Sequence, residues 1–221
     1  MKRIFRLLFL ASTAAGLALP FLAPGTWPWW DSVWIFCFFV LVYVDLVVRE
    51  GLSAARLSSG IVVISMAVLL GISGLTGWPV GPLRFTAHAG LMLGGAIPLV
   101  LPLLSFALLT ASSQASAAAF PGAGRFGLAI ATAGAFLFSL VNGLTFFAAD
   151  RIWWEWNPAG EPHAAVRAIF GLFFLAAAAF PLAFAYPVDS RMRQSRWSTG
   201  LEAWIGANAL FLIANLAGLL R

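Results

Sequence analysis

The sequence has few of the residues on which redox and metal chemistry depend. Its 221 residues include one cysteine, Cys37, and two histidines. A single cysteine excludes an internal disulfide, a Cys-x-x-Cys redox pair and a cysteine-based zinc site. His88 and His163 fall in separate connecting segments without helical His-x-x-x-His spacing. We therefore predict no metal site, and no paired axial ligands for a transmembrane haem.

Charged residues are scarce as well. Lysine occurs once, as Lys2, so a retinal Schiff base in the last helix is excluded. Only 10% of the residues are charged, whereas 62% are hydrophobic. A soluble domain of this length cannot hide so much apolar surface from water, and we therefore predict an integral membrane protein that contacts membrane lipid.

Seven apolar stretches fill most of the chain, and each is close to the roughly 20 residues that a helix needs to cross a bilayer. Spanning segments must be helical, because lipid offers no partners to an open backbone. The sequence thus predicts an all-α, polytopic membrane helical bundle of about seven helices, as a single domain over residues 1–221. The expected spans are 5–23, 33–48, 58–76, 88–112, 126–149, 165–187 and 201–220.

The first span follows Met1-Lys2-Arg3, and this pattern is also that of a cleaved signal peptide. Ala18-Leu19-Pro20 is a poor cleavage site, and we expect the span to remain as a helix. With the N-terminus inside, nine Lys and Arg residues lie on the cytoplasmic side and four outside. This asymmetry obeys the positive-inside rule and predicts a multi-pass protein of the cell inner membrane. The net charge of +5 is then a topology signal and no evidence for a nucleic-acid partner.

Few polar residues fall inside the spans. Asp45 precedes Arg49 by one helical turn, which favours an i,i+4 ion pair, although an intramembrane carboxylate can also serve as an acid or proton site. Asn142, Asn208 and Asn215 are typical of hydrogen bonds between helices. A small-solute transporter would need more polar groups at mid-membrane than these, but that class stays open.

The outer side of the predicted bundle is richer, since eight of the ten tryptophans and both histidines fall there. Two outer connections, Thr76 to His88 and Asp150 to His163, combine turn-forming residues with ionisable groups and aromatic rings. The tryptophans can form an interfacial belt or line a pocket for an apolar substrate. We also expect Pro98 and Pro102 to kink the fourth helix, and the segment from Ser112 to Gly124 to form a cytoplasmic loop.

These residues carry a family resemblance. Thr76-Gly77-x-Pro79-Val80-Gly81-x-Leu83-x-Phe85, followed by Ile97-Pro98-Leu99-x-x-Pro102, resembles the signature of a polytopic carotenoid-biosynthesis family that includes the bacterioruberin-pathway and gamma-carotene hydratases. Asp150 and the Trp154-Glu155-Trp156 run resemble the family's Asp followed by Trp-x-Trp. The chain departs from the family at Leu83 and Phe85, which replace tyrosines. It departs also near Leu70, where a glutamate is expected, and at Asn142, where an aspartate is expected.

The resemblance implies addition of water to a terminal isoprenoid double bond of a carotenoid, without a cofactor. Such an enzyme is a hydratase, which belongs to the lyases. It needs a general acid, surroundings that stabilise a carbocation, and a positioned water molecule. The residues implied are Asp150 or Glu155 as the acid, with Asp45 as the fallback, Arg84 or His88 to orient water, and Trp78, Phe85, Trp153, Trp154 and Trp156 to bind substrate. A non-catalytic membrane subunit that binds pigment or lipid, with or without protein partners, stays open as the alternative.

Overall fold

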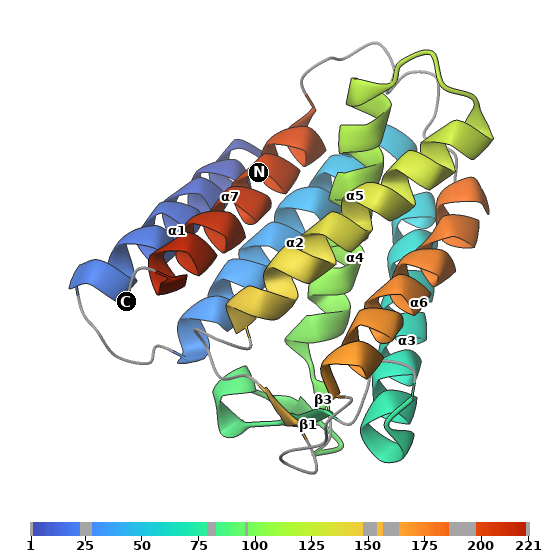
Figure 1. Ribbon diagram of the computed structural model, residues 1–221. Coiled ribbons are helices and arrows are strands. Elements are labelled where there is room, and N and C mark those ends of the chain that lie inside the picture. The colour runs from blue at the N-terminus through green and yellow to red at the C-terminus, as the bar shows by residue number, and fades with distance from the viewer. Residues whose placement is uncertain are drawn as a thin grey trace.

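The computed structural model describes residues 2–22, 28–78, 83–95, 97–147, 154–156, 164–185 and 198–219. These residues form a bundle of seven α-helices, as the sequence predicts (Figure 1). The helices are α1 (Lys2–Leu22), α2 (Pro28–Glu50), α3 (Leu52–Thr76), α4 (Val100–Ala119), α5 (Arg125–Thr145), α6 (Ala164–Ala185) and α7 (Thr199–Leu219). Five of them, α2, α3, α4, α5 and α7, are long and apolar enough to cross a membrane. Within α6 the apolar stretch Gly171–Phe184 is shorter.

Helix α4 is the centre of the bundle, because it packs against α2, α3, α5 and α7. Helix α1 packs on α2 and α7, and α6 packs on α5. The interior between α1, α2 and α7 is aromatic: Phe9, Trp34, Phe38 and Phe211 are almost fully buried, with ring centroids 5.2–6.0 Å apart. The first predicted span is therefore part of the packed bundle.

Helix α4 begins later than expected. The predicted span was 88–112, whereas the helix starts at Val100, with Pro98 outside it and Pro102 as its third residue. Proline is tolerated there because the first N–H groups of a helix have no partner within the helix. The two prolines therefore mark the start of α4, and the predicted kink within the helix is wrong.

Helix α4 also ends later than expected. The segment from Ser112 to Gly124 was predicted as a loop, but α4 continues to Ala119, and Ser112, Ala115 and Ser116 are buried. Small side chains let helices approach closely, and α4 here lies against α7. The small, weakly apolar residues that suggested a loop are thus a packing surface.

The boundaries of the other helices agree more closely with the sequence. Helix α2 includes Trp29, Trp30 and Trp34, which lengthen the second span as far as Pro28. Helix α3 ends at Thr76 because Gly77 adopts a left-handed conformation, with φ of 72°, and its N–H donates to the carbonyl of Ser73 at 2.8 Å. Glycine takes this conformation without steric cost, so the turn expected at this point is confirmed.

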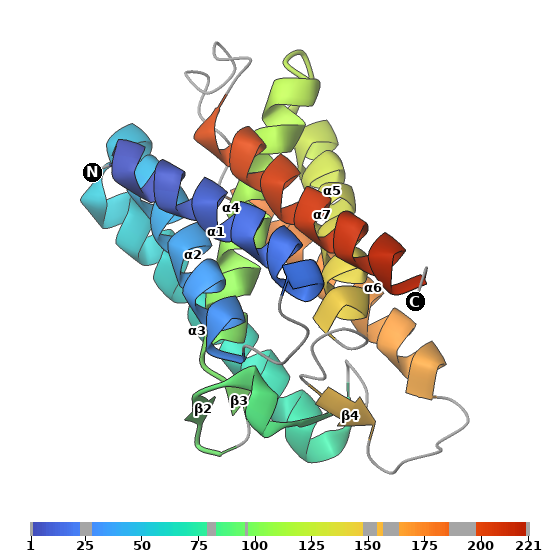
Figure 2. The same cartoon turned by 90° about the vertical axis from the view of Figure 1, so that its left-hand side faces the viewer.

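Four short strands, which the sequence did not predict, lie at one end of the bundle (Figures 1 and 2). They are β1 (Leu83–Phe85), β2 (Met92–Leu93), β3 (Ile97–Pro98) and β4 (Trp154–Trp156), and a 3₁₀ turn, η1 (Ala87–Ala89), follows β1. Strand β1 pairs with β4, and β2 pairs with β3, both antiparallel. The turns between α2 and α3 and between α4 and α5 lie at the opposite end of the bundle.

Candidate functional site

The two outer connections singled out from the sequence meet in one β-ribbon. In the pairing of β1 with β4, Leu83 is opposite Trp156, Arg84 is opposite Glu155, and Phe85 is opposite Trp154. Five of the ten predicted site residues, Arg84, Phe85, Trp154, Glu155 and Trp156, therefore belong to a single two-stranded element. Residues directly opposite in an antiparallel pair have neighbouring Cβ atoms, so the register alone makes Arg84 and Glu155 neighbours.

An apolar pocket lies between the helices next to this ribbon. It is open on one side and spans about 620 Å³ when the open space is included, and Phe85 of β1 forms part of its wall. The other described lining residues are Leu70 of α3, Leu101, Leu104, Ser105 and Leu108 of α4, Ser139, Leu140, Gly143 and Leu144 of α5, Phe147 just after α5, and Leu172 and Leu175 of α6. We call this the apolar pocket.

The polar groups of the apolar pocket are two hydroxyls that already donate to backbone carbonyls. Ser105 donates to Leu101 at 3.0 Å, and Ser139 donates to Ala135 at 3.0 Å. Ser139 Oγ also accepts a hydrogen bond of 2.9 Å from Asn208 Nδ2. No carboxyl group occurs among the described residues that line the pocket. The pocket therefore suits a hydrocarbon chain.

Two departures from the family pattern fall in or beside the apolar pocket. Leu70, near the position where a glutamate is expected, is part of its wall. Asn142, which replaces an expected aspartate, instead joins helices. Its Nδ2 lies 3.5 Å from Asn208 Oδ1, and its backbone carbonyl accepts a hydrogen bond of 3.1 Å from Asn215 Nδ2. The predicted hydrogen bonds of all three asparagines between helices are thereby confirmed.

The remaining described candidates on the outer side, Trp78 and His88, are not among the described lining residues of the apolar pocket. Trp78 is 60% exposed, and its ring meets Phe174 edge-on at 5.1 Å. His88 is half-buried in η1, and its backbone N–H donates to Thr86 Oγ1 at 3.2 Å. Asp150 and Trp153, together with His163, lie outside the described residues. No group of three metal-ligating side chains occurs in the described part of the chain.

Asp45 is at the other end of the bundle and is fully buried. Its Oδ2 lies 2.8 Å from Arg49 Nε, which confirms the predicted i,i+4 ion pair. Its Oδ1 lies 2.5 Å from Lys2 Nζ on α1, a contact that the sequence did not predict. Two cations thus neutralise the carboxylate, an arrangement that holds α1 to α2, and Asp45 is not among the described lining residues of the apolar pocket.

The fold and the apolar pocket together define the class of protein as an α-helical bundle with several helices suited to a membrane. Comparison of the chain with protein-family models, with curated proteins and with solved structures gives no match. The function must therefore be argued from the pocket and the ribbon beside it.

Proposed function

We propose that the protein binds an elongated apolar molecule of the isoprenoid or carotenoid class within the membrane, in the apolar pocket. The observation that carries this proposal is the lining of the open pocket, which consists mainly of leucines and two phenylalanines, Phe85 and Phe147. A ligand without polar groups fits because Ser105 and Ser139 already direct their hydroxyl protons to the backbone.

Two further points support an isoprenoid over an ordinary lipid chain. The resemblance to carotenoid-biosynthesis proteins is specific over the segment from Thr76 to Pro102, and Phe85 and Leu101 of that segment line the pocket. The rings of Phe85 and Phe147 offer flat, polarisable faces to a conjugated chain. The resemblance and the chemistry of the lining thus favour the same kind of ligand.

The test is co-expression with a pathway that makes lycopene or gamma-carotene, followed by purification and mass spectrometry of the extracted pigment. We expect carotenoid to co-purify with the protein. Leu140→Trp would fill the pocket and remove most of the pigment. Val141→Trp is the matched control, because Val141 is the next residue of α5 and is 46% exposed on the outside of the bundle. Absence of pigment, or equal loss in both variants, would contradict the proposal.

A second candidate function is hydration of the carotenoid, which is favoured because the pairing of β1 with β4 brings together Arg84 and Glu155, two of the residues that the resemblance implies for this reaction. A carboxylic acid at Glu155 would donate its proton to one carbon of a terminal double bond, leaving a tertiary cation on the other carbon. Water would add to the cation and return a proton to the carboxylate, so the product is a tertiary alcohol. An aromatic face beside the cation would stabilise it, and the resemblance implies Trp154 and Trp156 for this role.

This second function predicts a co-purified or extracted pigment heavier by one water. Glu155→Gln removes the proton donor while keeping the size of the side chain, and should abolish the heavier product while pigment binding persists. Asp150→Asn tests the other implied acid in the same way. If only unchanged pigment is found with the wild-type protein, hydration is excluded and the binding function stands.

A further inference from the structure

The four helices that line the apolar pocket form an incomplete ring. Helix α3 packs on α4, α4 packs on α5, and α5 packs on α6. In the part of the chain that the structure describes, α3 and α6 do not pack closely against each other. In Figure 1 both helices lie at the right-hand edge of the bundle, and Figure 2, turned by 90°, shows them apart. The pocket is therefore open through the gap between α3 and α6.

The strands cover the end of the pocket. Phe85 of β1 is half-buried and lines the pocket. Ile97 of β3 is buried, and a Cβ atom added at Gly71 of α3 would lie 3.3 Å from its Cδ1. The strands thus pack directly on α3. A ligand that approached along the axis of the bundle would have to displace them, whereas a ligand that entered from the side would not.

The helices that border the gap have apolar outer faces. Ile64, Val68 and Leu75 of α3 are exposed, and so are Ile169 and Phe173 of α6. Side chains of this kind are suited to contact with lipid, so the gap opens toward the hydrocarbon of the membrane. Passage through water would be unfavourable for an apolar molecule, in proportion to its apolar surface. A lateral opening avoids that step.

Two aromatic rings meet across this gap. Trp78 follows the end of α3 by two residues, and its ring meets that of Phe174 on α6 edge-on, with centroids 5.1 Å apart. The backbone of Trp78 is held in place, because its N–H donates to Thr76 Oγ1 at 3.2 Å. The two side chains are 60% and 37% exposed. The rings can therefore separate without opening the buried core.

The position of Phe174 on α6 is next to the pocket wall. Successive residues of a helix are about 100° apart around its axis, so Phe174 is one such step from Leu175, which lines the pocket. Phe173 is about 160° from Leu175 and lies on another flank of the helix. Phe174 is thus at the edge of the opening, and Phe173 is not.

We infer that an apolar ligand passes from lipid into the apolar pocket through the gap between α3 and α6, and that Trp78 and Phe174 form the gate of this gap. The inference rests on the proposed function, because it concerns entry to the same pocket. It adds the source of the ligand, which is the surrounding bilayer. Trp78, which the resemblance implies as a substrate-binding residue, would then act at the entrance.

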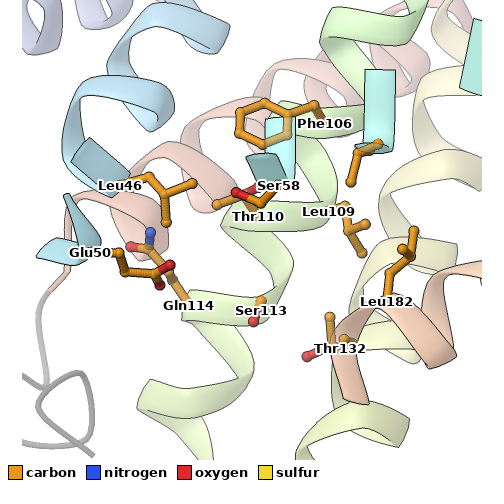
Figure 3. Close-up of a pocket in the computed structure, with 12 residues that line it drawn as sticks. Leu46, Glu50, Ser58, Phe106, Leu109, Thr110, Ser113, Gln114, Thr132 and Leu182 are labelled. Carbon is orange, nitrogen blue, oxygen red and sulfur yellow. The ribbon is translucent and has the colours of Figure 1, made fainter. Parts of the chain in front are cut away.

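A second pocket, to which α3, α4, α5 and α6 also contribute, lies toward the opposite end of the bundle (Figure 3). Its described lining includes the hydroxyl groups of Thr110, Ser113 and Thr132 and the carboxyl group of Glu50. A hydrocarbon would remove these polar groups from water without offering them hydrogen bonds, which is unfavourable. An apolar ligand that passes the gate would therefore stay in the apolar pocket.

The first test measures how fast bound pigment leaves. The full chain, loaded with lycopene by co-expression, is immobilised and washed with lycopene-free detergent micelles, and the remaining pigment is followed by absorbance. Phe174→Ala removes one ring of the gate and should speed the loss about two- to tenfold, the range for one aromatic pair. Occupancy at equilibrium, measured in nanodiscs prepared with lycopene, should change by less than twofold.

Phe173→Ala is the matched control, because Phe173 is the preceding residue and is exposed on another flank of α6. It should change the rate of loss by less than twofold. Equal acceleration in the two variants would contradict a gate at Phe174. So would a fall in equilibrium occupancy as large as the rise in the rate, because the ring would then contribute to binding and not to passage.

The second test closes the gate. In a protein with Cys37→Ala, which removes the only cysteine, Trp78→Cys and Phe174→Cys are joined by a bifunctional thiol reagent that a reductant cleaves. Linkage should slow the loss of lycopene about tenfold or more relative to the same protein before linkage, and cleavage should restore the rate.

The control for linkage is the pair of Arg6→Cys and Glu202→Cys, joined across the contact between α1 and α7, which should leave the rate unchanged. Loss of lycopene at an unchanged rate after linkage of positions 78 and 174 would overturn this inference and leave the proposed function intact. Failure of the wild-type protein to carry lycopene at all would overturn both.

Discussion

Gln114 on α4 and Gly200 on α7 are in direct contact, with Gln114 Oε1 accepting a hydrogen bond of 3.0 Å from the N–H of Gly200. The contact requires glycine, because a Cβ at position 200 would overlap the amide of Gln114. It satisfies one of the free N–H groups at the start of α7 and fixes the orientation of the Gln114 side chain. The same contact therefore joins two helices and leaves Nε2 buried without a hydrogen-bond partner among the described residues.

We predict that Gly200→Ala destabilises the protein by about 1–3 kcal/mol, because the added methyl group displaces the amide and the N–H of residue 200 loses its partner. Thermal unfolding in detergent measures the effect. Gly60→Ala on α3 is the control, since a Cβ there meets nothing within 4 Å, and its higher helix propensity should leave stability equal or slightly higher. Equal melting temperatures for the two variants would show that the contact is unimportant.

A second prediction concerns Asp45, which is fully buried between Lys2 and Arg49. Asp45→Asn leaves both cations without their counter-charge, and we expect a loss of about 1–3 kcal/mol, since Lys2 and Arg49 retain some access to solvent. Chemical unfolding monitored by tryptophan fluorescence measures it. Adding Arg49→Leu to Asp45→Asn should recover part of the loss, because one uncompensated charge is then removed.

The control for Asp45 is the pair formed by Arg6 and Glu202, in which two contacts of 2.9 Å link α1 to α7 on a more exposed surface. Arg6→Gln should cost less than about 1 kcal/mol, because exposed ion pairs are screened by water and salt. If Arg6→Gln costs as much as Asp45→Asn, burial does not govern the strength of these pairs.

Local sequence patterns were sufficient to predict most of the helices. Apolar runs of sufficient length indicated seven helices, and i,i+4 spacing indicated the pair of Asp45 with Arg49. The errors arose at α4, where Pro98 and Pro102 were read as a kink within a helix and Ser112 to Gly124 as a loop. The same prolines can start a helix or kink it, and the same small residues can form a loop or a contact between helices. Which of these occurs depends on neighbouring helices that the local sequence does not identify.

The candidate site was only partly predictable, for a similar reason. The two outer connections could be recognised by composition, but their pairing through Arg84 and Glu155 joins residues about 70 positions apart. The second pocket could be recognised in part, because its lining residues Thr110, Ser113 and Gln114 are spaced three and four residues apart and share one face of an apolar helix. That pattern indicates a polar stripe, but it does not identify Glu50 of α2 or Thr132 of α5 as residues of the same lining.

A third prediction concerns the buried indole of Trp34, whose Nε1 donates to Thr13 Oγ1 at 3.0 Å. Thr13→Val keeps the shape of the side chain but leaves the indole N–H without an acceptor, and we expect a cost of about 1–2 kcal/mol. Thr13→Ser keeps the hydroxyl and should cost less. Thermal unfolding of both variants provides the measurement, and a Thr13→Val variant as stable as Thr13→Ser would mean that the hydrogen bond contributes nothing.

The last prediction concerns Asn208 and Ser139, which join α7 to α5 through a hydrogen bond of 2.9 Å beside the apolar pocket. Hydrogen bonds between helices in a membrane contribute about 0.6 kcal/mol on average and at most about 1.7 kcal/mol, because the separated helices find other partners. A double-mutant cycle of Ser139→Ala and Asn208→Leu should therefore give a coupling energy within that range. Asn215 binds the carbonyl of Asn142 and not Ser139, so the cycle of Ser139→Ala with Asn215→Leu should be additive within about 0.5 kcal/mol. Coupling of similar size in both cycles would indicate that the substitutions act through a general shift of α7 and not through the bond to Ser139.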